Sequence, residues 1–175
     1  MPELDGKVAI VTGAGRLRGI GRAAAAAYAR LGADVVVTGT GRNPDSFPDD
    51  EKAVNWRDVE STADEVRALG RRALTMTVDA TNQEHVQAMI DGAVAEFGRV
   101  DILVNNAAFA RGADRVPVAD LTPDLFNLVM DIKVGGTFYC TKAFMEQITK
   151  QGEGGKIVNI SSSAGKRGSS NTLAY

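Results

Sequence analysis

The sequence predicts an α/β fold, in which a doubly wound parallel sheet carries helices on both faces. Short apolar runs alternate along the chain with segments of helical periodicity, and glycines or polar turn residues separate them. The run at residues 8–11 is continuously apolar, which is typical of parallel strands that are covered on both faces. A length of 175 residues fits one domain with a proper core. We therefore expect residues 1–175 to form a single three-layer α/β/α domain.

The first unit is a strand, a glycine-rich turn and a helix. Residues 8–11 (VAIV) predict the strand, residues 13–21 (GAGRLRGIG) the turn, and about residues 19–31 an alanine-rich helix that ends at Gly32. Glycines allow positive φ, and the first helical turn presents unpaired N–H groups and the positive end of the helix dipole. This stretch favours a bound dinucleotide phosphate, although many alanine-rich helices follow a glycine turn for packing alone.

The second strand is predicted over residues 34–38 and is followed by a long polar loop, residues 39–57. Loops of this length inside compact domains are usually functional or mobile. Trp56 in this loop is expected either to line a pocket or to anchor the loop to the surface.

The remaining elements continue the alternation. A helix begins near Asp58 and closes at Gly70, and a later helix, capped by Thr81 or Asn82, ends at Gly98. The fourth predicted helix is opened by Thr122 and Pro123 and runs to about Thr149. The other predicted strands are residues 73–78, 101–104 and 156–160.

Several polar or glycine-rich segments follow the carboxyl ends of these strands, where ligands bind in doubly wound sheets. They are the glycine turn, the segment 38–40 with Thr40, Asp79, Asn105-Asn106 and the serines 161–163. Their convergence predicts one site.

Composition excludes several classes of partner. The net charge of −2 is spread over mixed residues, so neither a nucleic acid nor a membrane surface is expected as a partner. Cys140 is the only cysteine and His85 the only histidine, which excludes an intrachain disulfide and a Cys/His zinc site, and we expect no metal. No basic segment with an apolar core opens the chain and no apolar run approaches ~18 residues, so a cytoplasmic protein is expected.

Four features occur in a characteristic order. They are Thr12-Gly13 with Gly19-Ile20-Gly21, then Asp79, then Asn105-Asn106-Ala107, and then Ser162 thirteen residues before Tyr175. With them the sequence resembles the short-chain dehydrogenase/reductase family over essentially the whole chain, and most closely its 3-oxoacyl-carrier-protein-reductase-like branch. The resemblance implies a Rossmann-type fold and an NAD(P)-dependent oxidoreductase.

The resemblance also implies roles for individual residues. Asp79 and Ala80 would hold the adenine, and Asn106 and Ala107 would lie along the cofactor ribose. The adenosine and pyrophosphate would be surrounded by Gly13, Gly15, Arg16, Gly19, Ile20 and Gly21.

Tyr175 would be the general acid or base and Ser162 would bind the carbonyl oxygen, where negative charge builds as hydride reaches the carbon. Because a free tyrosine has a pKa of about 10, it needs a nearby positive charge. In the family a lysine four residues after the tyrosine supplies this charge.

The sequence departs from the family pattern at three places. The chain given ends at Tyr175, so that lysine and the last two strands of the family lie outside it, and we interpret the chain as a C-terminally incomplete dehydrogenase. Five residues, 14–18, separate Thr12-Gly13 from Gly19 where the family has three, which leaves open which arginine meets the adenosine phosphate. Lys133 stands where the family has an asparagine. Three roles for Lys133 are open. Its side chain points away and its backbone carbonyl takes the place of the asparagine, or its ammonium lowers the pKa of Tyr175 as a catalytic residue, or the lysine is merely tolerated there.

Cofactor choice depends on the end of the second strand. Residues 39–42 (GTGR) contain no acidic side chain that would bind the ribose 2′-hydroxyl of NAD, while Arg16, Arg18 and Arg42 are available for a 2′-phosphate. The sequence therefore favours NADP, with NAD as the alternative.

The predicted activity is the interconversion of a ketone and a secondary alcohol by direct hydride transfer. The alternative is a catalytically silent dinucleotide-binding protein, a sensor or partner subunit, on the same scaffold. A sugar-nucleotide epimerase or dehydratase of the extended branch is disfavoured by the Asn-Asn-Ala stretch and by the short spacing from Gly21 to Tyr175. The substrate would be a small-molecule carbonyl or alcohol. Members of the family commonly form dimers and tetramers, so the resemblance implies a homodimer or homotetramer.

Overall fold

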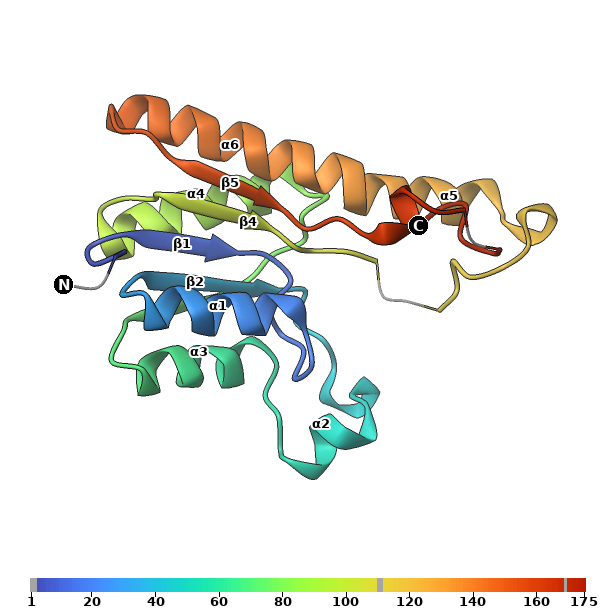
Figure 1. Cartoon of the computed structure of the whole chain (residues 1–175), viewed down its shortest axis with the longest axis horizontal. Coiled ribbons are helices and arrows are strands. Elements are labelled where there is room, and N and C mark those ends of the chain that lie inside the picture. The colour runs from blue at the N-terminus through green and yellow to red at the C-terminus, as the bar shows by residue number, and fades with distance from the viewer. Residues whose placement is uncertain (1–2, 110–111, 169) are drawn as a thin grey trace.

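Five parallel strands form one sheet at the centre of the computed structural model, which describes residues 3–109, 112–168 and 170–175 (Figure 1). The sheet order is β3-β2-β1-β4-β5, and each neighbouring pair is parallel. The strands are β1 (Val8–Val11), β2 (Asp34–Gly39), β3 (Ala73–Thr77), β4 (Ile102–Asn105) and β5 (Lys156–Asn159). The predicted strands and the doubly wound, Rossmann-type arrangement are confirmed, with strand ends within one residue of the expected ones.

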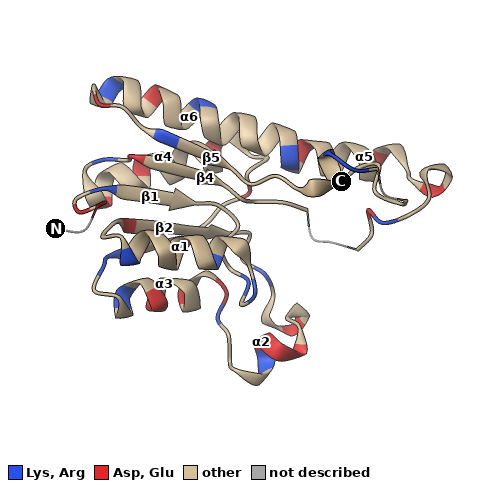
Figure 2. Cartoon of the chain, in the orientation of Figure 1, with Lys and Arg blue, Asp and Glu red and all other residues tan. Residues whose placement is uncertain are grey.

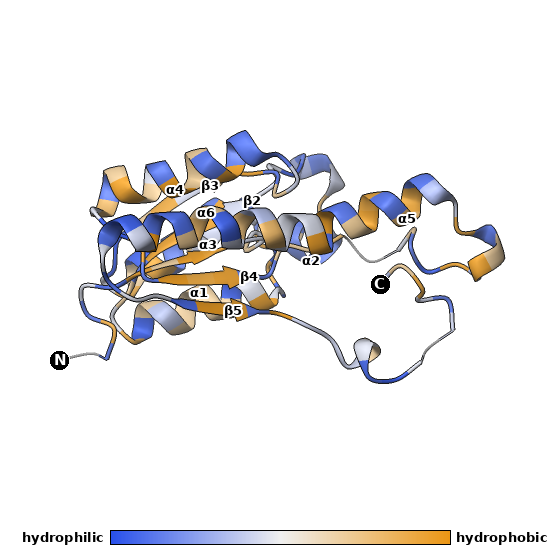
Figure 3. Cartoon of the chain, turned by 90° about the horizontal axis from the view of Figure 1, so that it is seen from above, coloured by the Kyte–Doolittle hydropathy of each residue, from blue (hydrophilic) through white to orange (hydrophobic). Residues whose placement is uncertain are grey.

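Helices cover both faces of this sheet (Figures 1 and 3). On one face, Ala25 of α1 (Ile20–Arg30) and Val66 of α3 (Val59–Ala68) pack against Val35. On the other face, Met89 of α4 (Gln83–Phe97) and Phe144 of α6 (Gly136–Gln151) pack against Ile10. Successive side chains of a strand point to opposite faces of the sheet, so a single buried strand contributes side chains to the hydrophobic cores on both faces.

Local capping explains where two helices begin. The side chain of Asn82 accepts the N–H groups of Glu84 and His85 at the start of α4. Thr122 accepts the N–H of Leu125 at 3.3 Å at the start of α5 (Pro123–Met130). Both caps were among the expected ones.

Two expectations need correction. The segment after β2 is not a plain loop, because it contains a 3-10 turn, η1 (Pro44–Ser46), and the short helix α2 (Asp49–Ala53). The single helix expected up to about Thr149 is divided into α5, a wider π-helical stretch η3 (Asp131–Gly135), and α6. Such π turns often mark functional positions, and this one carries Lys133.

At the amino end of the sheet, Asp101 joins β1 to β4. Its carboxylate accepts the Val8 N–H at 3.0 Å, the Lys7 ammonium at 3.2 Å and the Arg99 guanidinium at 2.6 Å. Burial raises the pKa of Asp101, but these hydrogen bonds outweigh it and hold the pKa below its ordinary value. Figure 2 shows that most other charged residues belong to the helices and loops and few belong to the strands.

Candidate active and cofactor site

The strand order reverses between β1 and β4, and the carboxyl ends of these two strands are locked together. The buried hydroxyl of Thr12 donates to the Val104 carbonyl at 3.1 Å and accepts the N–H groups of Asn106 and Ala107 at 3.0 Å each. The side-chain amide of Asn106 donates in turn to the carbonyls of Thr12 at 2.8 Å and Gly13 at 2.9 Å. Ligands of doubly wound sheets bind at such a reversal.

The glycine turn needs glycine at two of its positions. Gly13 has φ +65°, and a Cβ there would lie 2.8 Å from the Cα of Ala107. A Cβ on Gly21 would lie 2.6 Å from Asn106 Nδ2. Helix α1 starts after Gly19 without a side-chain cap and without an acidic residue in its first turn. The N–H groups and the positive helix end are thus left to an anion, which fits the pyrophosphate of a dinucleotide.

The lengthened part of the turn, residues 14–18, is held by hydrogen bonds from the segment between β2 and α3 and from α3 itself. The indole Nε1 of Trp56 donates to the Gly15 carbonyl at 2.6 Å, and Thr62 Oγ1 donates to the Ala14 carbonyl at 2.8 Å. The Leu17 N–H donates to Glu51 Oε1 at 3.0 Å. Trp56 therefore anchors the segment between β2 and α3 to the glycine turn, which matches the expected anchoring role.

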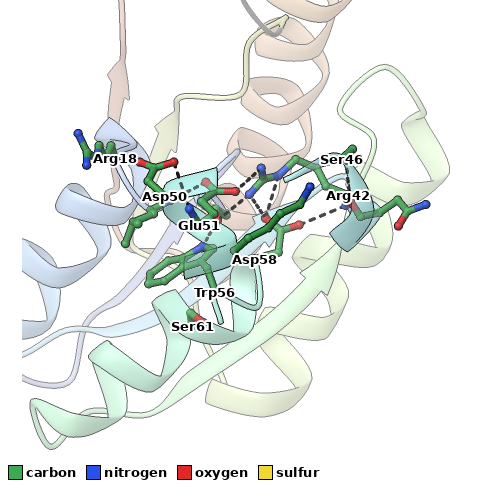
Figure 4. A network of polar contacts seen from close by, with 12 residues as sticks. Arg18, Arg42, Ser46, Asp50, Glu51, Trp56, Asp58 and Ser61 are labelled. Carbon is green, nitrogen blue, oxygen red and sulfur yellow. Dashed lines mark hydrogen bonds and ion pairs between the residues drawn. The ribbon is translucent and has the colours of Figure 1, made fainter. Parts of the chain in front are cut away.

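The arginines expected at the adenosine end differ in their surroundings. Arg16 is exposed, and Arg18 is an exposed partner of Asp50 at 2.9 Å. Arg42 is half-buried and pairs with Glu51 at 2.8 Å and Asp58 at 3.0 Å (Figure 4). Sequence reasoning missed these two carboxylates, which lie 9 and 16 residues beyond Arg42.

The remaining residues predicted to hold the cofactor lie around the same edge of the sheet. Ile20 is 61% exposed and Thr40 is exposed just beyond β2. Asp79 is exposed after β3, where its carboxylate accepts the N–H of Thr81 at 2.9 Å and the Thr81 hydroxyl at 2.8 Å. Ala80 is buried, and Ala107 contacts the glycine turn.

A second group of predicted residues meets at Tyr175. The ammonium of Lys133 lies 3.4 Å from the centroid of the Tyr175 ring and donates to the Tyr175 carbonyl at 3.1 Å. The guanidinium carbon of Arg115 lies 3.8 Å from the same centroid. Sequence reasoning missed Arg115, because it lies in an irregular loop with no recognisable pattern.

The surroundings of Tyr175 change its acidity. A hydrogen bond with Ser162, together with the positive charges of Lys133 and Arg115, lowers the pKa of the Tyr175 phenol. Burial lowers the pKa of Lys133 in turn. The structure thus brings Ser162, Tyr175 and Lys133 together.

Lys133 does not point away from this group. Its side chain faces Tyr175, and its backbone carbonyl accepts the hydroxyl of Thr137 at 2.7 Å. The first of the three expectations for Lys133 was a side chain that points away from Tyr175 while the backbone carbonyl takes the place of the family's asparagine. The direction of the side chain contradicts it.

The described residues contain neither a helix that could cross a membrane nor a cluster of metal ligands. Within the described ranges, no helix combines the length and apolar character that a membrane crossing requires. In the same part of the chain, no three histidine, cysteine, aspartate or glutamate side chains gather as ligands for a metal ion.

Comparisons with known proteins agree on one family. The family model described as short chain dehydrogenase matches residues 7–175. The chain is 39% identical over 174 residues to the short chain dehydrogenase/reductase astE of Aspergillus oryzae, and 34% identical over 173 residues to the 2-dehydro-3-deoxy-D-gluconate 5-dehydrogenase of Escherichia coli. Each alignment covers 99% of this chain and 60% of the relative.

A solved structure gives the same result. The carveol dehydrogenase of Mycobacterium avium, crystallised in complex with NAD, superposes with a TM-score of 0.85 at 30% identity, over 100% of this chain and 61% of that one. The chain thus spans about three fifths of the length of the proteins it matches.

Proposed function

The chain belongs to the short-chain dehydrogenase/reductase family, and from this membership we propose that the whole protein interconverts a ketone and a secondary alcohol with a nicotinamide dinucleotide. The observation that carries the proposal is the position of Tyr175 beside Ser162, with Lys133 and Arg115 against its ring. The relatives named above do not single out the 3-oxoacyl-carrier-protein reductase branch, so the proposal stays at the level of the family.

The cofactor would be held along the carboxyl edge of the sheet. Gly13, Gly19 and Gly21 offer a close approach to the backbone at the uncapped start of α1, which suits the pyrophosphate. Asp79 and Ala80 would border the adenine, and Asn106 and Ala107 the ribose. When bound, the dinucleotide supplies the hydride to the carbonyl carbon or takes it from the alcohol carbon.

The chain's own residues would handle the proton. During reduction, negative charge builds on the substrate oxygen, where the Ser162 hydroxyl donates a hydrogen bond and the Tyr175 phenol gives up its proton. Lys133 and Arg115 stabilise the tyrosinate that remains, and a proton from solvent restores the phenol. In total, ketone, reduced cofactor and one proton become alcohol and oxidised cofactor, and oxidation follows the same path in reverse.

The helices α5 and α6 support a proposal about assembly. Apolar side chains are exposed along them and along η3, which joins them: Phe126, Leu128, Met130, Val134, Phe138 and Met145. Exposed apolar side chains that gather on adjoining elements are typical of interfaces between proteins. We propose a homodimer or homotetramer, which size-exclusion chromatography with light scattering tests directly.

The proposed activity is tested with the full-length protein, NADH and NADPH, and a panel of ketones. Turnover that falls by about 10²-fold or more in Tyr175→Phe, with cofactor binding retained, is expected for loss of the general acid. Tyr139→Phe, on α6, is the matched control and should keep turnover. Cofactor binding without turnover on any ketone would favour the silent sensor or partner subunit instead.

A further inference from the structure

Arg42 forms a group of ion pairs with Glu51 and Asp58 (Figure 4), and its Nη2 also donates to the Gly15 carbonyl of the glycine turn at 3.1 Å. Its guanidinium donates from Nη1 to Glu51 Oε2 at 2.8 Å and from Nη2 to Asp58 Oδ1 at 3.0 Å. The side chains of Arg42, Glu51 and Asp58 are 17%, 4% and 12% exposed, so water screens the group poorly. One guanidinium and two carboxylates leave this group with a net negative charge.

Asp58 carries its carboxylate to the gap between the glycine turn and the end of β2. A Cβ on Gly15 would lie 1.7 Å from Asp58 Oδ1, and a Cβ on Gly39 would lie 3.8 and 3.9 Å from the two carboxylate oxygens. Residues 38–41 at the end of β2 offer no acidic side chain of their own. Asp58 thus delivers, from the start of α3, a carboxylate to the end of β2.

The side chain of Asp58 is not used as a helix cap. Asp58 is the N-cap residue of α3, but its carboxylate makes no capping hydrogen bond to that helix. An aspartate at this position ordinarily accepts a hydrogen bond from the first helical turn. Here the carboxylate turns to the backbone N–H of Arg42 at 3.2 Å and to its guanidinium, on a backbone with φ +53°. Non-glycine residues rarely adopt positive φ, so the fold maintains this orientation against an intrinsic cost.

We propose that Asp58, held by Arg42 and Glu51, selects NAD over NADP by placing its carboxylate where the adenosine ribose 2′-hydroxyl binds. The inference rests on the proposed function, because it requires a dinucleotide in the glycine turn. A carboxylate accepts a hydrogen bond from a ribose hydroxyl and repels a phosphate at the same position.

The state of Arg42 supports this preference. A 2′-phosphate brings about two negative charges to a group that is already net negative. Arg42 is free to bind that phosphate only if it leaves two poorly hydrated carboxylates, and breaking such pairs is strongly unfavourable. The expectation of NADP rested on the lack of an acid in residues 39–42 and on the availability of three arginines. Glu51 and Asp58, from further along the chain, remove the first ground and occupy Arg42, one of those arginines.

Two arginines of the glycine turn itself, Arg16 and Arg18, compete with Asp58 in determining the preference between NAD and NADP. Arg16 is exposed, and Arg18 is 81% exposed and pairs with Asp50. If either bound a 2′-phosphate, NADP would be preferred in spite of Asp58. The variant Arg16→Ala separates the two determinants, because it removes a cation without touching the group around Arg42.

The test is calorimetric titration of the full-length protein with NAD and with NADP. We expect NAD to bind about tenfold or more tightly than NADP, and Asp58→Asn to narrow this ratio by about tenfold, because a charged hydrogen bond to NAD and a repulsion of NADP are both lost. Asp45→Asn removes an exposed carboxylate of the same segment and should leave the ratio unchanged.

Two results would overturn the inference. The first is a preference of the wild type for NADP, in particular a preference that Arg16→Ala abolishes, and the second is a ratio of NAD to NADP affinity that Asp58→Asn leaves unchanged. If Asp58→Asn does not fold, Glu51→Gln decides in the same titration, because freeing Arg42 from one carboxylate must raise the affinity for NADP. Binding of neither cofactor to the folded wild type would refute the proposed function and this inference with it, whereas binding of both with equal affinity refutes the inference alone.

Discussion

Thr12 and Asn106 hold the carboxyl ends of β1 and β4 together through reciprocal hydrogen bonds. The hydroxyl of Thr12 accepts the Asn106 N–H at 3.0 Å, and the Asn106 side chain donates to the Thr12 carbonyl at 2.8 Å. The same hydroxyl accepts the N–H of Ala107 and donates to the Val104 carbonyl. One buried oxygen therefore sets the spacing between the glycine turn and the segment expected to border the cofactor.

Replacing this hydroxyl should loosen the site. Thr12→Val keeps the shape but leaves two backbone N–H groups and one carbonyl without their partner, so we expect the free energy of unfolding to fall by about 2–4 kcal/mol. Cofactor affinity should fall as well. Urea unfolding and cofactor titration measure both effects, and Thr12→Ser, which keeps the hydroxyl, should restore most of each. Equal stability of Thr12→Val and wild type would show that these hydrogen bonds contribute little.

Lys133 should set the pH dependence of turnover. Its charge is one cause of the lowered pKa of Tyr175, so Lys133→Asn should raise that pKa. Alcohol oxidation needs the deprotonated tyrosine, and its rate should therefore rise at a higher pH in the variant than in wild type. A pH–rate profile measured with saturating cofactor checks this shift, and Lys142→Asn on α6 serves as the control. An unchanged profile would reduce Lys133 to a tolerated lysine.

Asp101 should make stability depend on pH in the acid range. Its pKa in the folded protein lies below the ordinary value of 3.8, so its contribution is present above that value and is lost as the pH falls through the folded pKa. Asp101→Asn should therefore cost about 2 kcal/mol at pH 7 and progressively less below about pH 4. Denaturant unfolding at a series of pH values measures the difference. Asp91→Asn, at an exposed position on α4, should show almost no difference at any pH.

Two phenylalanines of α6 should respond differently to truncation. Phe144 is fully buried, and Phe144→Ala should cost about 3–5 kcal/mol in the free energy of unfolding because it leaves a cavity. Phe138 is 59% exposed, and Phe138→Ala should change monomer stability by less than about 0.5 kcal/mol. If Phe138 belongs to an interface between copies, its truncation should instead weaken the oligomer, which light scattering at several protein concentrations detects.

Much of the fold could be predicted because it depends on local signals. Short runs rich in apolar residues marked the strands, most clearly the continuous run VAIV of β1, and single polar residues such as Asn82 and Thr122 marked helix starts. The glycine turn was recognisable from the glycines that stand between an apolar run and a run of helix formers. The structure explains two of these glycines, because a Cβ on Gly13 or Gly21 would lie too close to Ala107 or Asn106. In each case the residues that carry the signal are neighbours in the sequence.

The charges around Arg42 could not be predicted in the same way. Arg42 looked available for a phosphate because residues 39–42 contain no acid, whereas its partners Glu51 and Asp58 arrive through the fold of the segment that follows. Arg115 reaches Tyr175 from a loop 60 residues earlier in the chain. Ion pairs across such distances depend on the tertiary structure and leave no periodic pattern in the sequence.

The central claim is that Tyr175 passes a proton to the oxygen of a carbonyl whose carbon receives hydride directly. The most direct test is reduction of a responsive ketone by full-length protein with reduced cofactor deuterated on the transferring face of C4, followed by mass spectrometry of the alcohol. We predict one deuterium on the carbinol carbon, formed at a rate that drops by about 10²-fold or more in Tyr175→Phe. An alcohol without deuterium from cofactor labelled on either face, or an undiminished rate in Tyr175→Phe, would contradict the account.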